Sequence, residues 1–228
     1  MPKGGEEHLM YDTAAIVLAA GLSRRMGPVN KLLVQINGTP MIRATVSACA
    51  EVCDAPVTVV TGHQAPDIEQ ALAGLNLRFI HNPDFASGQS SSVAAGLMAA
   101  PEAKTTMIVL GDQPLLDAHA LERLLEAHLA SDQTRITIPV NGANRGNPLV
   151  IPLALKASLL ADKENPGCRR FTRDNPDKVN PVALQNPAYF SDLDTPDDLK
   201  SFQIGVGTRT VPADTLRLNK ARTRVIDL

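Results

Sequence analysis

The sequence is poor in the residue patterns that mark metal centres and disulfide scaffolds. It has three cysteines without a paired zinc spacing, and five histidines that form no HxH, HExxH or Cys/His cluster. Cys49 and Cys53 stand four positions apart in an apolar stretch, where helical geometry puts both on one buried face. We therefore expect reduced core cysteines, no catalytic histidine and no disulfide framework.

The sequence also lacks an excess of charge of one sign and any long apolar run. Its net charge is -2 with acidic and basic residues interspersed, which gives no general attraction to nucleic acid or to an anionic membrane. The first ten residues hold no apolar core of a signal peptide, and no run approaches the length of a transmembrane helix. These absences predict a cytoplasmic protein that acts on small molecules, with no nucleic-acid or membrane partner.

What the chain does have is enough apolar sequence for one full-sized core, since 44% of its 228 residues are hydrophobic. Short apolar, β-branched runs alternate with longer amphipathic segments. Most of the runs are uniformly apolar, as in strands that are buried on both faces of a parallel sheet. The expected strands are residues 14–20, 57–61, 77–81, 107–110 and 136–140.

The alternation predicts an α/β fold with a doubly wound, mostly parallel sheet of the Rossmann-like type and helices on both faces. Thr39 should cap the first helix with Pro40 as its first residue, and Asp117 should precede another. The expected helices are residues 40–53, 93–100, 118–130 and 195–202.

The chain divides into an N-terminal extension (1–12), one domain (13–202) and a C-terminal tail of unknown role (203–228). From residue 141 the rhythm of strands and helices weakens, and glycine, proline and cations become frequent. We interpret this stretch as an elaboration on the acceptor side of a ligand cleft. Ligands of such sheets bind beyond the carboxyl ends of the strands, so the loops there are the candidate sites.

The loop after the first strand has the composition of a phosphate cradle. Gly21 and Gly27 let the backbone turn its amides toward an anion, and Ser23, Arg25 and Lys31 add donors and positive charge. The spacing is neither that of a Walker loop nor that of a GxGxxG dinucleotide fingerprint. An ordinary turn with solvated arginines is the alternative interpretation.

Two aspartates are candidates for holding a metal. Asp112 directly follows a buried strand, at the carboxyl edge of the sheet, and Asp194 lies in Ser191-Asp-Leu-Asp-Thr-Pro196. Magnesium is commonly held by one or two carboxylates together with substrate phosphates. The structural alternatives are a turn residue for Asp112 and a helix cap for Asp194. Asp192 and Asp194 also spell DxD, a short pattern associated with metal-dependent glycosyl transfer.

A serine-rich segment, Gly88-Gln-Ser-Ser-Ser92, leads from a strand into a helix. Its hydroxyls and amides can read a base edge or hold a ribose or phosphate, although one serine is expected to cap the helix. His63, at the end of the second strand, is either a backbone contact to a nucleotide or a surface histidine.

Together these motifs resemble the nucleotidyltransferases of molybdenum cofactor maturation, and most closely the cytidylyltransferase branch. The resemblance spans residues 14 to 202. The motifs are Leu18-Ala-Ala-Gly-Leu-Ser-Arg-Arg-Met-Gly27 with Asn30-Lys31-Leu32, Thr61-Gly62, Gly88-Gln-Ser-Ser-Ser92, Gly111-Asp-Gln-Pro114, Arg145-Gly-Asn-Pro148 and Asp192-Leu-Asp-Thr-Pro196.

The resemblance implies a glycosyltransferase-A-like Rossmann fold and the transfer of CMP from CTP to molybdenum cofactor, with release of pyrophosphate. It implies that Arg25, Lys31 and Asp112 are catalytic and that Asp112 and Asp194 bind Mg²⁺. The implied nucleotide-binding residues are Leu18, Ala19, Ala20, Gly21, Ser23, Arg25, Lys31, Thr61, Gly62, Gly88, Ser90, Ser91 and Asp112. The implied acceptor-binding residues are Arg145, Gly146, Asn147, Pro148, Gly167, Arg169 and Arg170.

The acceptor motif of this branch usually reads Arg-Gly-His-Pro, whereas Asn147 stands here in place of the histidine. A sugar phosphate, a polyol phosphate or another small phosphate is therefore an alternative acceptor, and GTP is an alternative donor. A nucleotide-binding delivery module without catalysis and a DxD glycosyltransferase are the further alternatives. The family-based partner is a molybdenum hydroxylase apoenzyme or its chaperone.

Overall fold

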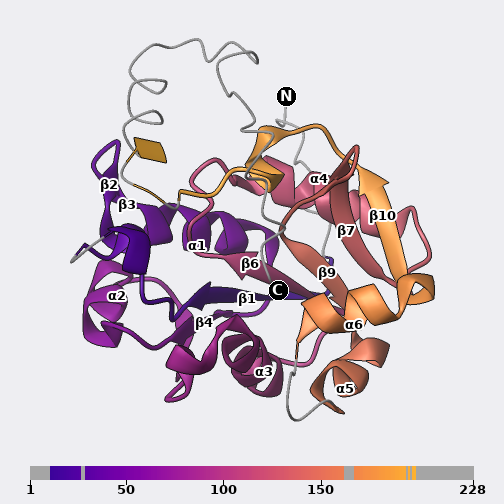
Figure 1. The fold of residues 1–228 in the computed structure, drawn as a ribbon, viewed down its shortest axis with the longest axis horizontal. Helices are drawn as coiled ribbons and strands as arrows, with labels where there is room; N and C mark the ends of the chain where they lie inside the picture. The colour runs from indigo at the N-terminus through magenta and orange to yellow at the C-terminus, as the bar shows by residue number, and fades with distance from the viewer. Residues whose placement is uncertain (1–10, 27–28, 162–166, 194, 196, 199–228) are drawn as a thin grey trace, which may run out of the picture.

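A computed structural model describes residues 11–26, 29–161, 167–193, 195, 197 and 198. Its centre is a sheet with the strand order β10-β7-β9-β6-β1-β4-β5, most of whose strands are labelled in Figure 1. β8 pairs with the last two residues of β7. A separate two-stranded ribbon consists of β2 and β3. The strands are β1 (Thr13–Ala19), β2 (Gln35–Ile36), β3 (Thr39–Pro40), β4 (Val57–Thr61), β5 (Leu77–His81), β6 (Thr105–Leu110), β7 (Ile136–Asn141), β8 (Asn144–Arg145), β9 (Leu149–Pro152) and β10 (Val179–Ala183).

The sheet is mostly parallel, as the sequence predicted. β1 is buried along its whole length and pairs in parallel with β4 and β6, and β4 pairs in parallel with β5. β9 runs antiparallel to both β6 and β7, and β10 is parallel to β7. The carboxyl ends of β1, β4 and β6 therefore meet at one edge, where ligands of doubly wound sheets bind.

Helices cover both faces of the sheet (Figure 1). On one face, α1 (Met41–Val52), α2 (Ala65–Ala71) and α4 (Ala118–Leu129) share a core with β1, β4 and β6. On the other, α3 (Gln89–Ala99), α5 (Leu153–Ala161) and α6 (Cys168–Asp174) close a second core. Single turns of 3₁₀ helix lie at η1 (Arg24–Met26), η2 (Lys31–Leu33), η3 (Phe85–Ser87), η4 (Pro176–Lys178) and η5 (Pro187–Tyr189).

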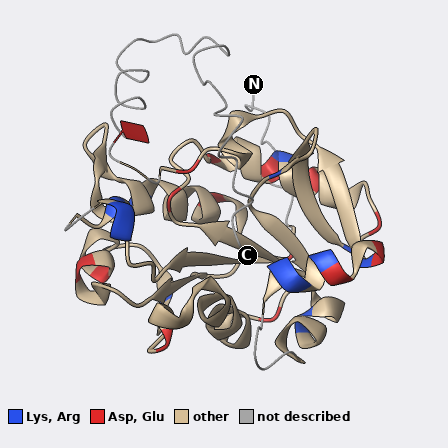
Figure 2. Ribbon diagram, in the orientation of Figure 1, with Lys and Arg blue, Asp and Glu red and all other residues tan. Residues whose placement is uncertain are grey.

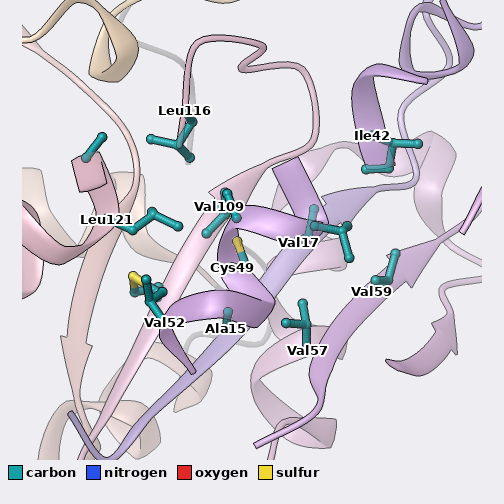
Figure 3. Packing of buried hydrophobic residues seen from close by; sticks show 14 of the residues in the cluster. Ala15, Val17, Ile42, Cys49, Val52, Val57, Val59, Val109, Leu116 and Leu121 are labelled. Atoms are coloured by element: carbon teal, nitrogen blue, oxygen red, sulfur yellow. The ribbon is translucent and has the colours of Figure 1, made fainter. Parts of the chain in front are cut away.

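The first core shows why the strands carry uniform apolar runs. In Figure 3, Ile42 and Cys49 of α1 pack toward Val17 of β1 and Val109 of β6. All four side chains are fully buried. Burying one aliphatic side chain of this size contributes about 1.5–3 kcal/mol, so the sheet centre is the stable frame that holds the loops.

The helix starts differ in detail from the sequence predictions. Pro40 is the N-cap of α1 rather than its first residue, and Thr39 lies in β3. α3 begins at Gln89, earlier than expected, and its N-cap is Gly88 at φ 127° rather than a serine. Asp117 caps α4 as predicted, since its side chain accepts a hydrogen bond from the Ala120 amide.

The region after residue 141 is more regular than its composition indicated. β9 and β10 join the main sheet, and α5 and α6 cover its second face. The sequence of β10 is Val-Asn-Pro-Val-Ala. Because it contains a proline and a polar residue, β10 was not predicted from its apolar pattern. Cys49 is buried as predicted, whereas Cys53 is the C-cap of α1 and only partly buried. All three thiols are free.

The last predicted helix is described at its start alone. The Thr195 amide donates to Asp198 Oδ2 at 2.8 Å, and the Asp198 amide donates to Thr195 Oγ1 at 3.1 Å, which is the reciprocal pattern of a capping box. Residues 199–202 and the tail 203–228 lie outside the described residues. None of the helices that the structure describes is long and apolar enough to span a membrane.

Candidate nucleotide and acceptor site

The predicted motifs converge at the carboxyl edge of the sheet. The Gly111 amide donates to the Leu18 carbonyl at 3.1 Å, and the His63 amide donates to the Ala20 carbonyl at 3.3 Å. These hydrogen bonds hold the loop after β1 between the loops after β4 and β6. Residues far apart in the sequence thus form one edge, as ligand binding at such a sheet requires.

The loop after β1 is shaped by its own polar side chains. Ser23 adopts a positive φ of 48°, and its Oγ accepts a hydrogen bond from the Lys31 amide at 3.3 Å. The buried Asn30 caps η2 through its Oδ1, which accepts from the Leu32 amide at 3.1 Å. Arg25 lies exposed in η1, the basic turn shown in blue beside α2 in Figure 2. Gly27 lies outside the described residues.

Lys31 and Asp112 form an ion pair at the centre of this edge. Lys31 Nζ donates to Asp112 Oδ2, and the two side chains are 16% and 14% exposed. Lys31 starts η2 and Asp112 follows β6, so two separate elements bring the charges together. An ion pair shielded from water in this way interacts more strongly than one on the open surface. Lys31 is suited to contact a polyanionic ligand, and Asp112 is suited to bind the cation that accompanies such a ligand.

Two glycines at this edge have different surroundings. A Cβ placed on Gly62 would lie 2.7 Å from Phe85 Cβ and 2.9 Å from Ala20 Cβ, so only glycine fits between these loops. A Cβ on Gly21 would meet nothing within 4 Å, and Gly21 is exposed. Thr61 is fully buried and its carbonyl accepts from the Asn82 amide at 2.8 Å, and Gly62 is buried as well, so both residues hold the loop after β4 in place.

The acceptor motif is tied to Asp112 by a residue that the sequence analysis did not single out. Gln113, which is 1% exposed, donates through Nε2 to the carbonyls of Asn147 at 3.3 Å and Ala188 at 3.2 Å. The Asn147 amide donates to the Tyr189 carbonyl at 2.8 Å, and Gly146 contacts Tyr189 so closely that a Cβ would lie 2.5 Å from its carbonyl oxygen. Asn147 and Pro148 are buried.

The serine segment divides into structural and accessible positions. Ser91 Oγ and Ser92 Oγ accept from Asn82 Nδ2 at 2.9 and 3.0 Å, and Ser91 Oγ also lies within donor distance of the Asp84 and Gly88 carbonyls. Ser91 therefore fixes the turn before α3. Ser90 remains partly exposed beside α6.

α6 brings a group of arginines to the start of α3. A cavity of about 430 Å³ lies between the two helices, and Figure 2 shows the basic stretches of α6 in blue. Gly167, at φ 134°, lies beside Ser90, since a Cβ on Gly167 would be in ordinary van der Waals contact with the Ser90 Cα at 3.7 Å. The lining residues are Gly88, Gln89, Ser90, Gly167, Arg169, Arg170 and Arg173.

Arg145 joins this region from β8. Its Nη2 donates to Thr172 Oγ1 of α6 at 2.9 Å. Burial lowers the pKa of Arg145 below its ordinary value, and the neighbouring charge of Arg173 lowers the same pKa further. The structure thus unites the predicted residues Gly167, Arg169, Arg170 and Arg145 and adds Arg173, whose place on a short helix gave no sequence signal.

The possible metal ligands are carboxylates. The Leu193 amide donates to the Asp112 carbonyl at 3.3 Å, so the chain just before Asp194 lies against Asp112. Asp194 itself lies outside the described residues. Among the residues that are described, no three His, Cys, Asp or Glu side chains gather to hold a metal by themselves. A hard cation shared between one or two carboxylates and substrate phosphates fits this donor set.

Fold and site together define an α/β nucleotidyltransferase. The sequence profile of the MobA-like NTP transferase domain matches residues 15–179, which is more than half of the chain. The chain belongs to this family.

Two curated relatives cover different shares of the chain. Molybdenum cofactor cytidylyltransferase of Escherichia coli is 27% identical over 186 residues, which cover 80% of this chain and 91% of that protein. The bifunctional protein GlmU of Lactobacillus delbrueckii is 33% identical over 114 residues, or 50% of this chain. The match spans only 24% of the length of that GlmU protein.

Solved structures share the fold over most of its length. A nucleotidyl transferase from Methanothermobacter superposes with a TM-score of 0.73 at 25% identity, over 87% of this chain and 99% of that one. A Mycobacterium tuberculosis protein that was solved in complex with manganese superposes with a TM-score of 0.66 at 21% identity, over 85% and 98% of the two chains.

Proposed function

We propose that this chain is a magnesium-dependent cytidylyltransferase that transfers CMP from CTP to the terminal phosphate of molybdenum cofactor and releases pyrophosphate. The observation that carries the proposal is the Lys31–Asp112 ion pair at the edge between β1 and β6. It stands where a triphosphate and a divalent cation would need a cation and a carboxylate side by side. The similarity to a molybdenum cofactor cytidylyltransferase over 80% of this chain supports the choice of donor and acceptor.

The chain's own residues would bind and orient the nucleotide. Gly21 leaves open space beside the loop for close approach of the base and ribose, and Arg25 and Lys31 supply cations for the phosphates. Gly88 and Ser90, at the start of α3, line the cavity that lies between α3 and α6. Asp112, with Asp194, would hold the magnesium ion, which neutralises phosphate charge when it is bound.

The reaction needs positioning more than it needs proton transfer. An oxygen of the acceptor phosphate forms a bond to the α-phosphorus of CTP, while the bond from that phosphorus to the bridging oxygen of pyrophosphate breaks. A phosphate monoester is already anionic at neutral pH, so no general base is required. The task of the residues is to hold two anions together, with Arg145 and the α6 arginines on the acceptor side.

A second acceptor class has a specific observation in its favour. Asn147 replaces the usual histidine of the acceptor motif and is buried, with its backbone held by Gln113 and Tyr189. A sugar or polyol phosphate would use the same nucleotide half with a different acceptor pocket. The molybdenum hydroxylase or chaperone partner stays a prediction.

The test is pyrophosphate release from CTP and from GTP, with magnesium, in the presence and absence of molybdenum cofactor. We expect release from CTP that requires the cofactor. Lys31→Ala and Asp112→Asn should each lower kcat/KM by at least about 100-fold, because each removes a charge that stabilises the transition state. Lys104→Ala is the matched control, since Lys104 is 83% exposed and pairs with Asp12 at 3.7 Å, away from the edge.

A rate with Lys31→Ala equal to that of Lys104→Ala would refute the phosphate role. Turnover with a sugar or polyol phosphate and none with molybdenum cofactor would select the second acceptor class. Nucleotide binding without release of pyrophosphate in the presence of any of these acceptors would leave the non-catalytic delivery module.

A further inference from the structure

Lys31 and Asp112 contact each other, although the proposed reaction gives them different ligands. Lys31 Nζ donates to Asp112 Oδ2, and the two side chains are only 16% and 14% exposed. In the proposed reaction the ammonium group of Lys31 contacts the triphosphate, while the carboxylate of Asp112 holds the metal ion. The ion pair must therefore open before both groups can take up their ligands.

The backbone is fixed on both sides of this ion pair. Lys31 begins η2, where its amide donates to Ser23 Oγ at 3.3 Å and its carbonyl accepts from the Val34 amide at 3.2 Å. The carbonyl of Asp112 accepts from the Leu193 amide at 3.3 Å. Because both backbones are held, the ion pair opens through movement of the side chains. Lysine is suited to this movement, since its charge is a point charge on a flexible four-carbon stem.

The charge of Lys31 opposes the binding of a metal ion to Asp112. An ammonium group and a divalent cation at the same carboxylate repel each other, and partial burial strengthens the repulsion because water screens it less. Additional protein ligands could outweigh this repulsion. In the part of the chain that the structure describes, however, no three His, Cys, Asp or Glu side chains gather to hold a metal. Asp112 paired with Lys31 is therefore a weak site for a free metal ion.

A triphosphate reverses the effect of this charge. Its several negative charges attract the ammonium group and the metal ion together. When Lys31 Nζ moves from Asp112 to a phosphate oxygen, the carboxylate becomes available to the metal ion that accompanies the nucleotide. The charge that disfavours a free metal ion thus favours the complex of metal and nucleotide.

We infer that Lys31 makes Asp112 selective for a metal ion that arrives bound to the triphosphate, because its ammonium group holds the carboxylate against free metal ions. The inference rests on the proposed function and adds to it the order in which metal and nucleotide are taken up. Its consequence is a change of sign. Loss of the Lys31 charge should strengthen the binding of metal alone and weaken the binding of metal together with CTP.

The test measures the binding of Mn²⁺, a paramagnetic substitute for Mg²⁺, with and without CTP. In Lys31→Met we expect the Kd for Mn²⁺ alone to fall at least about tenfold and the Kd for the complex of Mn²⁺ and CTP to rise at least about tenfold. Lys31→Arg keeps the charge, so its Kd for Mn²⁺ alone should stay within about twofold of the wild-type value. Adding Asp112→Asn to Lys31→Met should abolish the gain, because the carboxylate is then absent.

Lys104→Met is the matched control. Lys104 Nζ also lies near an aspartate, 3.7 Å from Asp12 Oδ2, but this pair is exposed and stands at the amino ends of β1 and β6, at the opposite edge of the sheet. The control should bind Mn²⁺ as the wild type does. Melting temperatures without metal show which variants are folded, and Lys31→Gln is used if Lys31→Met is not. A folded variant with the wild-type Kd for Mn²⁺ alone would overturn the inference.

The inference and the proposed function fail in different ways. An unchanged Kd for Mn²⁺ in Lys31→Met, together with wild-type release of pyrophosphate that requires molybdenum cofactor, would overturn the inference and leave the proposed function standing. Tighter binding of Mn²⁺ in Lys31→Met, when the wild type releases no pyrophosphate with molybdenum cofactor, would support the inference and contradict the proposed acceptor.

Discussion

A substitution at Gly21 should affect nucleotide binding without affecting the stability of the fold. A Cβ at this position meets nothing within 4 Å, and Gly21 is not among the residues with positive φ. Gly21→Ala should therefore leave the free energy of unfolding unchanged or raise it by up to about 1 kcal/mol, because alanine restricts the unfolded chain. The proposed function puts the nucleotide against this loop, so it predicts that the added methyl group is felt only when the nucleotide binds.

The size of the binding defect follows from packing. Forcing a methyl group into a filled space costs about 1–3 kcal/mol, which corresponds to a rise in KM for CTP of about 5- to 150-fold. Urea denaturation measures the first quantity, and steady-state pyrophosphate release at varied CTP concentration measures the second. A variant with wild-type stability and wild-type KM for CTP would show that the nucleotide does not approach Gly21, and the phosphate-cradle interpretation would be wrong.

Two further substitutions test the frame around the site. Gly62→Ala should lower the free energy of unfolding by about 1–3 kcal/mol in urea denaturation, because its Cβ would lie 2.7 Å from Phe85 Cβ; wild-type stability would refute the close approach. Burial lowers the pKa of His128 in the folded state, so neutral His128 contributes stability above about pH 6.5, and that contribution is lost as the pH falls from there toward the lowered folded pKa. The melting temperature should therefore fall more between about pH 7.5 and pH 5 in the wild type than in His128→Gln, and equal slopes would contradict the assignment.

The parts of the fold that the sequence predicted are those in which local pattern and tertiary burial coincide. β4 has the predicted bounds, because its β-branched, fully buried run flanked by turns leaves few alternatives. β5 has the predicted bounds as well, although it mixes apolar with basic residues and none of its residues is buried. β10 was missed because its proline and asparagine sit in a strand at the end of the sheet, where one side needs no partner. The start of α3 was placed too late, since Gly88 rather than a serine caps it.

The site residues, too, divide into those that the local sequence pattern indicated and those that depend on tertiary contacts. Lys31 was a candidate as a cation of the loop after the first strand and Asp112 as a carboxylate at the end of another strand, and the structure pairs them. Gln113 and Arg173 were missed because their roles depend on contacts that the sequence does not display. Gln113 meets a carbonyl 75 positions away, and Arg173 lies at the end of a seven-residue helix whose orientation is set by Thr172 and Arg145.

Gln113 gives a physical reason why donor and acceptor recognition can change separately. Asp112 pairs with Lys31 at the carboxyl edge of the sheet, while the side chain of the next residue, Gln113, is buried and donates to the Asn147 and Ala188 carbonyls. The Arg145–Pro148 segment is therefore held through the backbone of Asn147, whose amide also donates to the Tyr189 carbonyl. The fold does not by itself select an acceptor, and for this reason the assay with several phosphate acceptors is the measurement that discriminates between them.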